Sequence, residues 1–142
     1  MERYFLPYDL SVKLKEKGFN VPFYFYYRTD DESKSLHHAN VTNPLVYSKV
    51  DNEVVIAPSF QQIFEWLRTE MNIDIEVESS TDMFSTLKVY IPYVCTYTEF
   101  RLKDSPDIVR YKQEKTNPQT NTIFEWENAA IEAIKYVIDE LI

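Results

Sequence analysis

The sequence predicts an α+β fold: one mainly antiparallel sheet of about four strands, with three helices packed on it in the order α-β-β-α-β-β-α. Two stretches predict it. Val54–Glu78 joins a short apolar run, a helix with its own start signal and a strand of strict alternation. Val21–Arg28 is rich in the aromatic residues that favour strands. The chain has 44% hydrophobic and 27% charged residues, as folded proteins do, and its length predicts a single domain over residues 1–142.

The first helix is predicted at Leu10–Lys17, with Asp9 as its N-cap. Gly18 follows directly, and it is the only glycine in the sequence. A glycine at this position, with Phe19 packed back on Leu14, is the pattern of a Schellman cap. We therefore expect Gly18 to have a structural role, as the stop of this helix.

Val21–Arg28 is the strongest strand signal, and its side chains alternate between two faces. One face carries Phe23, Phe25 and Tyr27, and the other carries Tyr24, Tyr26 and Arg28. We expect the phenylalanine face to meet helices. The tyrosine face fits three roles: a stacking platform for bases, an anchor surface for a protein, or a sheet face covered by other side chains.

Residues 29–43 form a predicted polar loop. It holds both histidines, His37 and His38, and the acidic run Asp30, Asp31 and Glu32. Adjacent histidines in an extended loop usually point apart, and no cysteine pair or HExxH spacing accompanies them. We therefore predict no metal site in this loop.

The middle of the chain predicts a strand followed by a helix. The strand lies within Leu45–Ile56 and is interrupted by a turn around Lys49–Asn52. In the helix, Ser59 and Gln62 form a capping box. The apolar stripe of this helix comprises Phe60, Ile63, Phe64, Leu67 and Met71.

Two further strands, Ile73–Glu78 and Ser85–Tyr97, are expected to pair as an antiparallel hairpin across a turn at Ser79–Met83. Pro92 argues for an edge strand or a bulge in the second of them. We place Cys95 on the apolar side of this strand, as a buried small hydrophobic residue rather than a nucleophile. That side carries Leu87, Val89, Ile91, Tyr93 and Cys95. On the other side, Lys88 is expected to offset part of the acidic row Asp74, Glu76 and Glu78.

Residues 98–122 allow two predictions: a second hairpin, or a short helix started by Ser105-Pro106-Asp107 and followed by a surface loop. A last helix is predicted at Phe124–Leu141. Thr122 and Glu125 offer it a capping box, and Trp126 is an alternative start. Its core face carries Ala130, Ile134, Val137 and Leu141.

The formal net charge of −8 is concentrated in residues 29–97, which carry four basic and eleven acidic side chains. An acidic middle disfavours binding to a phosphate backbone, so we predict no nucleic-acid partner. It keeps the protein soluble, and it also suits a basic partner. The single cysteine excludes an intramolecular disulfide, and neither a membrane span nor the apolar core of a signal peptide occurs. We therefore expect a cytoplasmic protein without membrane association.

No sequence motif for catalysis or cofactor binding is present. One glycine is too few for a loop that cradles phosphates, and no GxSxG nucleophile motif occurs. We predict that the protein is not an enzyme and has no catalytic residues, no cofactor and no metal. The rival interpretation is a small hydrolase or transferase whose site assembles from His37 or His38 and carboxylates distant in the sequence.

The order of the motifs resembles a family of small uncharacterised proteins from phages and prophages of Bacteroides-type bacteria. That family is similar to this chain in having LKxxGF near the start, AP[ST]xxxxxxWLR in the middle and an aromatic-Glu-x-Ala helix at the end. The matching residues here are Leu14, Lys15, Gly18, Phe19, Ala57, Pro58, Ser59, Trp66, Leu67, Arg68, Trp126, Glu127 and Ala129. The resemblance covers the helices and the central hairpin but not residues 29–43 or 98–122. It implies a phage or mobile-element origin and no catalytic activity.

These features together predict a non-catalytic accessory protein that binds a host or phage protein. Tyrosine buries large rigid area at interfaces, and an acidic rim steers basic partners. The predicted binding residues are Tyr24, Tyr26, Arg28, Asp30, Asp31 and Glu32. The alternative is a protein that sequesters a small molecule or nucleotide, with the same aromatic side chains as stacking walls. The sequence leaves the oligomeric state open.

Overall fold

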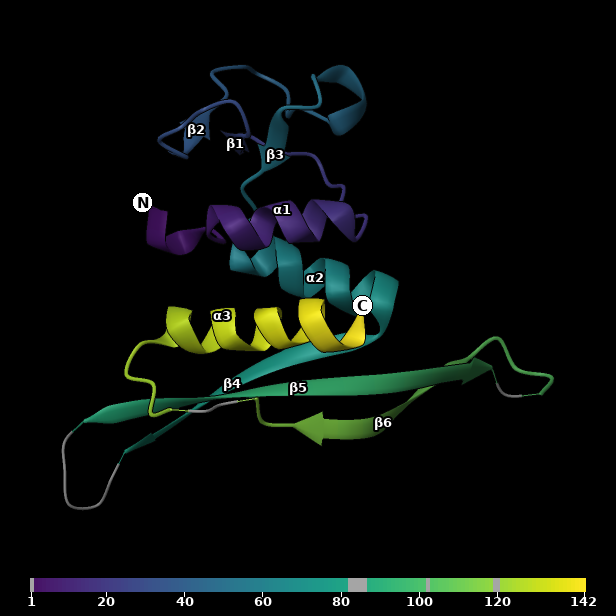
Figure 1. The fold of residues 1–142 in the computed structure, drawn as a ribbon. Helices are drawn as coiled ribbons and strands as arrows, with labels where there is room; N and C mark the ends of the chain where they lie inside the picture. Colours follow the sequence, from purple (N-terminus) through teal and green to yellow (C-terminus); the bar gives the residue numbers. More distant parts are fainter. Residues whose placement is uncertain (1, 82–86, 102, 119–120) are drawn as a thin grey trace. The chain divides into compact units, whose positions relative to one another are not determined.

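The structure is a computed structural model, and it describes residues 2–81, 87–101, 103–118 and 121–142, without the side chains of Glu2 and Phe100. The chain divides into two compact units, Met1–Ile63 with Ile142 (unit 1) and Phe64–Leu141 (unit 2). Each unit contains a three-stranded antiparallel sheet, which confirms the α+β class (Figure 1). Two sheets replace the single sheet of about four strands that we expected. The polar loop contributes a strand to the first sheet, and residues 98–122 contribute a strand to the second.

The two sheets have the strand orders β2-β1-β3 and β4-β5-β6. Unit 1 contains η1 (Glu2–Tyr4), α1 (Tyr8–Glu16), β1 (Phe25–Arg28), β2 (His37–His38), η2 (Tyr47–Lys49), β3 (Val54–Ile56) and the start of α2 (Phe60–Met71). Unit 2 contains the rest of α2, β4 (Ile73–Thr81), β5 (Lys88–Arg101), β6 (Ile108–Thr116), α3 (Trp126–Tyr136) and the π-helical turn η3 (Val137–Leu141).

Helix α1 begins at Tyr8, two residues earlier than predicted, and Asp9 is therefore not its cap. It begins there because the carbonyl of Pro7 accepts the first helical hydrogen bond, from Ser11 N at 3.0 Å. The predicted end is confirmed. Gly18 has φ of 92°, its N–H donates to Lys15 O at 3.0 Å, and Phe19 N donates to Leu14 O at 3.1 Å. These are the two hydrogen bonds of a Schellman motif.

The first sheet packs one face against an apolar cluster within unit 1. Tyr27 is 5% exposed and donates its hydroxyl to Leu6 O at 2.8 Å, so its polar tip is satisfied inside the core. The cluster comprises Tyr27, Val55 and Ala57, with Phe5, Tyr8, Val12, Phe25 and Leu36 packed against it. Strand β1 is shorter than the predicted Val21–Arg28, and Phe23 makes only an isolated bridge, to Leu45. The phenylalanine face nevertheless points inward as predicted.

Helix α2 begins with the predicted capping box. Ser59 N donates to Gln62 Oε1 at 3.0 Å, and Gln62 N donates to Ser59 Oγ at 3.2 Å. In the apolar stripe, Phe60, Ile63 and Leu67 are buried. The stripe therefore faces protein rather than solvent, as predicted from its helical spacing.

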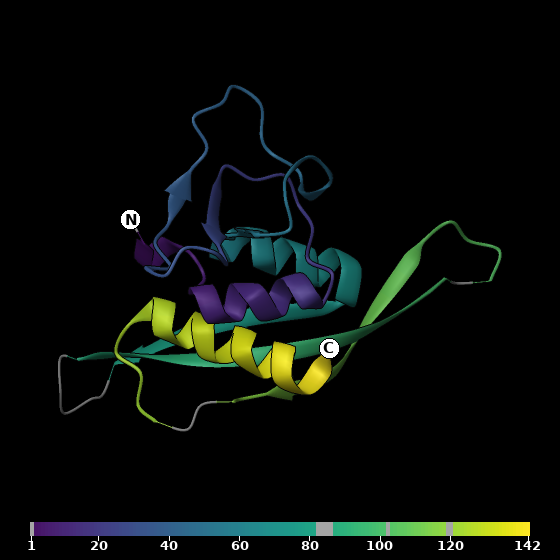
Figure 2. The ribbon, with the colours of Figure 1, turned by 45° about the horizontal axis from the view of Figure 1, so that its top comes forward.

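Helix α3 covers one side of the second sheet, and Figures 1 and 2 both show it lying across β4 and β5. The core between them contains Ile73, Val94, Ala129, Ala130, Ala133, Ile134 and Val137. The helix starts at Trp126 without a side-chain cap, so the alternative start is confirmed and the capping box with Thr122 is wrong. Leu141 is 38% exposed and does not belong to the core face, because the helix widens into the π-helical turn η3.

The pairing of β4 with β5 corrects the predicted sides of β5. Cys95 lies opposite Asp74, and Tyr93 lies opposite Glu76. Opposite residues in an antiparallel pair point to the same side, so Cys95 and Tyr93 share the side of the acidic row, and Val94 points to the core. Apolar residues alternate with apolar residues in this strand, so its pattern alone does not choose the inner side. Cys95 is nevertheless fully buried, as predicted.

Strand β6 is the structure that the ambiguous segment 98–122 adopts, and the extent of its pairing with β5 explains how β5 accommodates Pro92. It forms the second hairpin with β5, and no helix begins at Ser105. Its pairing with β5 starts at Val94 and has a bulge between Thr96 and Tyr97. Tyr90 N points away from β4, to Ile123 O, and Pro92 shares that direction by strand period. Pro92 thus removes no ladder hydrogen bond, because it lies at a local edge of a central strand.

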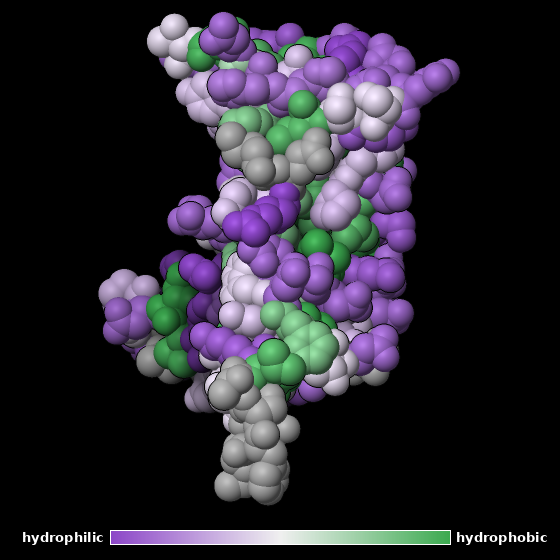
Figure 3. All heavy atoms as spheres, turned by 90° about the vertical axis from the view of Figure 1, so that its left-hand side faces the viewer, coloured by the Kyte–Doolittle hydropathy of each residue, from purple (hydrophilic) through white to green (hydrophobic). Residues whose placement is uncertain are grey.

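The large exposed hydrophobic side chains are spread along the chain, with Ile108 and Tyr111 both on β6. They are Tyr4, Tyr24, Val41, Leu87, Ile108, Tyr111, Phe124 and Leu141. On the face drawn in Figure 3, hydrophobic side chains form separate patches among hydrophilic ones. Among the described residues, no helix combines the length and hydrophobicity that crossing a bilayer requires.

Candidate functional site

The six predicted binding residues lie in unit 1, on β1 and the turn that follows it. Tyr24 precedes the strand, and Tyr26 and Arg28 alternate with the buried Tyr27. Asp30, Asp31 and Glu32 occupy the turn and loop that lead to β2. We call these six residues, together with Asp51, Glu53 and His37, the β1 surface. The six predicted residues therefore run along β1, with Tyr24 before the strand and the three acidic residues after it.

The two tyrosines of the β1 surface differ in accessibility. Tyr24 is 37% exposed, and its hydroxyl donates to Thr42 O at 3.3 Å. The ring of Tyr26 stacks on His37, with 5.3 Å between centroids and 18° between planes, and it meets Phe23 edge-on at 6.4 Å. The stack arises because Tyr26 and His37 are cross-strand partners. One face of Tyr26 is thus occupied, so Tyr24 is the freer anchor.

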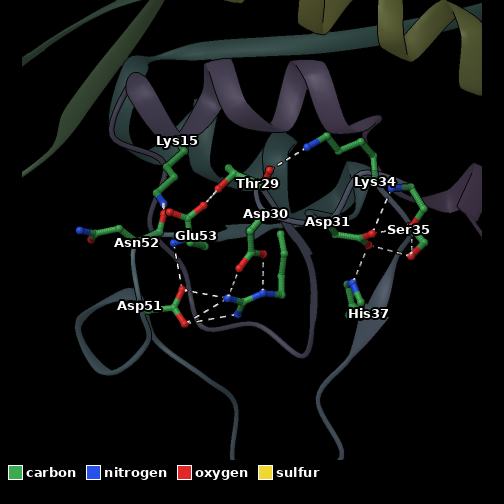
Figure 4. A network of polar contacts seen from close by, with 12 residues as sticks. Lys15, Thr29, Asp30, Asp31, Lys34, Ser35, His37, Asp51, Asn52 and Glu53 are labelled. Carbon is green, nitrogen blue, oxygen red and sulfur yellow. Dashed lines mark hydrogen bonds and ion pairs between the residues drawn. The ribbon is translucent and has the colours of Figure 1, made fainter.

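Arg28 binds two carboxylates from different loops, Asp30 and Asp51, which are labelled in Figure 4. Its Nε and Nη2 donate to the two oxygens of Asp30 at 2.8 and 3.0 Å, a bidentate pair. Its Nη1 and Nη2 donate to Asp51 Oδ2 at 3.3 Å. The hydrogen bond from Arg28 lowers the pKa of Asp30, and the hydrogen bond to Asp30 raises the pKa of Arg28. The guanidinium therefore joins the turn after β1 to the loop before β3.

Asp31 organises the loop between β1 and β2. Its Oδ1 accepts from the backbone N of Ser33 at 3.0 Å and from the Ser33 hydroxyl at 2.7 Å. Its Oδ2 accepts from the Ser35 hydroxyl at 3.0 Å and lies 3.1 Å from His37 Nε2 (Figure 4). The hydrogen bonds from Ser33 and His37 are the main reasons that the pKa of Asp31 falls far below its ordinary value. Sequence analysis named Asp31 but missed these partners, although Asp-x-Ser is a turn signal.

The remaining charged groups make the β1 surface acidic. Glu32 is exposed, and Glu53 accepts a hydrogen bond from the Thr29 hydroxyl. Lys34 is folded back, donating to Thr29 O at 2.8 Å and lying over the ring of Tyr8. Five carboxylates thus share this surface with Arg28 and Lys34. The excess negative charge favours a basic partner.

The pair formed by His37 and Asp31 meets one requirement of the rival, enzymatic interpretation. The Ser33 and Ser35 hydroxyls, however, bond to the carboxylate rather than to the imidazole, so neither of these two serines is paired with the histidine as a base. Neither His37 nor Asp31 lines the hollow described next. Within the described residues, no group of three or more His, Cys, Asp and Glu side chains is placed to hold a metal ion. The geometry fits a structural role for this pair.

Unit 1 also has an open hollow of about 280 Å³ beside the β1 surface. Its lining residues are Lys15, Gly18, Phe19, Asn20, Tyr47, Asp51 and Asn52. Lys15 Nζ donates to Asn52 O at 3.0 Å and Val54 O at 2.7 Å, and it lies 4.9 Å from the centre of the Tyr47 ring. Burial raises the pKa of Tyr47 to about 12, and its hydroxyl accepts from Ile56 N at 2.7 Å. Both groups are used to hold the loop before β3.

Comparison with known proteins gives no match: no protein-family model, no curated protein and no solved structure is similar to this chain.

Proposed function

We propose that this chain is a non-catalytic interaction protein that binds a basic segment of another protein through the β1 surface. The observation that carries the proposal is that β1 is preceded by the exposed ring of Tyr24 and followed by an excess of carboxylates, the exposed Glu32 with Asp30 and Asp51 around Arg28. A half-exposed aromatic ring supplies contact area, and a surrounding excess of carboxylates favours lysine and arginine over acidic partners.

The rigidity of this surface supports the same proposal. Arg28 on β1 hydrogen-bonds the turn after the strand and the loop before β3, and Asp31 hydrogen-bonds Ser33 and Ser35 within its own loop, so less conformational freedom is left to lose on binding. A surface that is already ordered needs no folding step before it recognises a partner. We therefore expect the backbone of unit 1 to change little when the partner binds.

The identity of the partner rests on the resemblance of the motifs to phage and prophage proteins. We propose an origin in a phage or mobile element, and a partner that is a host or phage protein. The lone buried Cys95 suits a reducing compartment, so we place the protein in the cytoplasm. The proposed origin, partner and location do not affect the proposal that the β1 surface binds a basic segment, because that surface is acidic whatever the source of the partner.

The proposal is tested by capturing partners from a bacterial lysate at low and at moderate salt, followed by mass spectrometry. Three baits are compared: the wild type, Tyr24→Ala with Tyr26→Ala, and Tyr111→Ala as the matched control. Tyr111 is 55% exposed on β6 in unit 2, so the control removes an exposed ring from elsewhere. We expect a protein with a basic segment that the wild type and the control retain, that the double variant loses and that salt releases.

Glu32→Gln provides a milder variant, since it removes one charge from the exposed rim. It should weaken capture without affecting the fold, which circular dichroism checks. The same proteins captured by all three baits would place the interaction outside the β1 surface and contradict the proposal.

The hollow beside Lys15 and Tyr47 favours a second candidate function, the binding of a small polar molecule. An ammonium group and an aromatic wall are suited to a nucleotide or a similar anion with a ring. A rise in melting temperature with a panel of nucleotides, together with an empty lysate capture, would support this candidate over the first. Tyr47→Ala should then abolish the rise.

A further inference from the structure

The side of the second sheet that faces away from α3 carries two rows of opposite charge. Strand β4 contributes an acidic row and β6 a basic row, with two tyrosines of the central strand between them. We call it the charged sheet side, and it comprises Asp74, Glu76, Glu78, Tyr93, Tyr97, Arg110, Lys112 and Lys115. No element of the described part of unit 2 lies over it, because α3 packs on the opposite side (Figure 1).

Within one chain the two rows are joined by one hydrogen bond, from Lys115 Nζ to Glu78 Oε1 at 3.3 Å, and by longer ion pairs. Lys112 Nζ is 3.7 Å from Glu76, Lys115 Nζ is 3.5 Å from Glu76, and Arg110 Nη1 is 3.9 Å from Asp74. These N···O distances exceed those of a good charge-assisted hydrogen bond. In the described structure, the buried Nε of Arg110 lies 3.3 Å from Glu99 Oε1 without a well-aligned hydrogen bond, and its buried Nη2 has no hydrogen-bond acceptor. Asp74 Oδ1 already accepts from Arg68 Nε at 2.9 Å, but the other donors and acceptors on this side have capacity left for further partners.

The centre of the charged sheet side is aromatic. Lys115 Nζ lies 4.3 Å from the centre of the Tyr93 ring, and the Arg110 guanidinium lies 4.3 Å from that of Tyr97. Both tyrosines are half-buried, and Cys95 on the same side has no exposed surface. Half-buried rings at the centre and charged groups at the edge are the arrangement of a protein interface.

We propose that this side binds the same side of a second copy of the chain. A two-fold axis lying between two facing sheets can exchange the rows, so that the carboxylates of β4 in each copy lie over the cations of β6 in the other. The alternative axis places like charges together and is disfavoured. The tyrosines of the two copies then meet at the axis. A nucleic acid fits less well, since the carboxylates of β4 repel phosphates.

The pairing of rows gives a test by charge reversal. Glu76→Lys with Glu78→Lys makes both rows basic, and Lys112→Glu with Lys115→Glu makes both rows acidic. By sedimentation velocity in the micromolar range, we expect a dimer for the wild type and monomers for each double variant alone. An equimolar mixture of the two variants should restore a dimer with one chain of each kind, because an acidic side then faces a basic one.

The mixture separates the proposal from loss of folding, since a misfolded variant would not be rescued by its counterpart. Lys135→Glu on α3 is the control for altered net charge and should leave the wild-type dimer intact. The neutral variant Glu76→Gln with Glu78→Gln should raise the dissociation constant by at least about tenfold. A wild type that stays monomeric, or a mixture that does not dimerise, overturns the proposal. The proposed dimer does not depend on the β1 surface, so the dimer proposal and the proposed function can each be contradicted without affecting the other.

Discussion

Asp31 accepts hydrogen bonds from two serines and meets His37, while Arg28 binds Asp30 and Asp51 from two segments. These two side chains therefore connect the turn after β1, the loop to β2 and the loop before β3 through hydrogen bonds. Their charged forms are the ones that the folded structure favours, because every partner of Asp31 is a donor and both partners of Arg28 are acceptors. The hydrogen bonds that order the β1 surface should therefore weaken when the pH falls low enough to protonate Asp31.

Asp31 gives a prediction about acid stability. Its pKa is lowered in the folded protein, so its contribution to stability is present above the unfolded pKa and is lost as the pH falls through the folded one. The difference in unfolding free energy between wild type and Asp31→Asn should thus be largest near neutral pH. It should shrink below about pH 4, the ordinary value for aspartate. Urea unfolding at a series of pH values measures it, and a difference that does not change with pH would contradict it.

Gly18 gives a prediction about backbone strain. Its φ of 92° is rarely adopted by other residues, and a Cβ added there would meet no atom within 4 Å. The cost of Gly18→Val should therefore come from the backbone and amount to about 1–2 kcal/mol. Gly18→Asn should cost less, because asparagine tolerates positive φ. Chemical denaturation of both variants measures the difference, and equal stability to wild type would show that Gly18 is not a cap.

Cys95 gives a prediction about reactivity. Burial raises the pKa of its thiol, and its side chain has no exposed surface, so the reactive thiolate is both scarce and inaccessible. A thiol reagent such as Ellman's should label the native protein at least about a hundredfold more slowly than the urea-unfolded chain. Comparable rates would mean that the side of β5 carrying Cys95 opens readily.

At the scale of elements, the sequence predicts correctly the helix ends that a single residue determines. It does not predict which side of a strand faces the core when both sides carry apolar residues. The capping box of Ser59 and the stop at Gly18 are specified locally, and the structure has both. The inner side of β5 is not specified locally, because Tyr93, Val94 and Cys95 are all apolar enough for a core. Pairing with the alternating strand β4 decides it.

The same reasoning applies to β2 and to the candidate site. The pair His37–His38 is too short and too polar to be predicted as a strand from the sequence. It is a strand because it pairs with Phe25 and Tyr26 of β1. The charge and aromatic character of the β1 surface were readable from the sequence. Its network was not, since Asp51 lies 23 residues from Arg28 and only the folded chain brings them together.

The capping box predicts a measurable contribution to stability. Ser59→Ala removes the acceptor for Gln62 N at the start of α2, which should cost about 1 kcal/mol. Ser80→Ala on the exposed part of β4 is the matched control and should be within about 0.5 kcal/mol of wild type. Thermal or urea unfolding of both variants checks this, and equal effects would argue against a cap at Ser59.

At the scale of the whole molecule, the two units present different kinds of surface. The β1 surface of unit 1 has excess negative charge and tight internal hydrogen bonds, and the charged sheet side of unit 2 has balanced charge and loose contacts. The first suits a basic partner of another kind, and the second suits a copy of itself. Oligomer formation through unit 2 would then present two β1 surfaces and raise the apparent affinity for a repeated partner.

The most direct test of the proposed function is the affinity of the captured partner, measured by isothermal titration calorimetry with three chains. These are the wild type, Tyr24→Ala with Tyr26→Ala, and the control Tyr111→Ala. We predict that the double variant raises the dissociation constant by about tenfold or more, that the control leaves it unchanged, and that added salt weakens the wild type. Equal affinity for all three chains would contradict binding through the β1 surface.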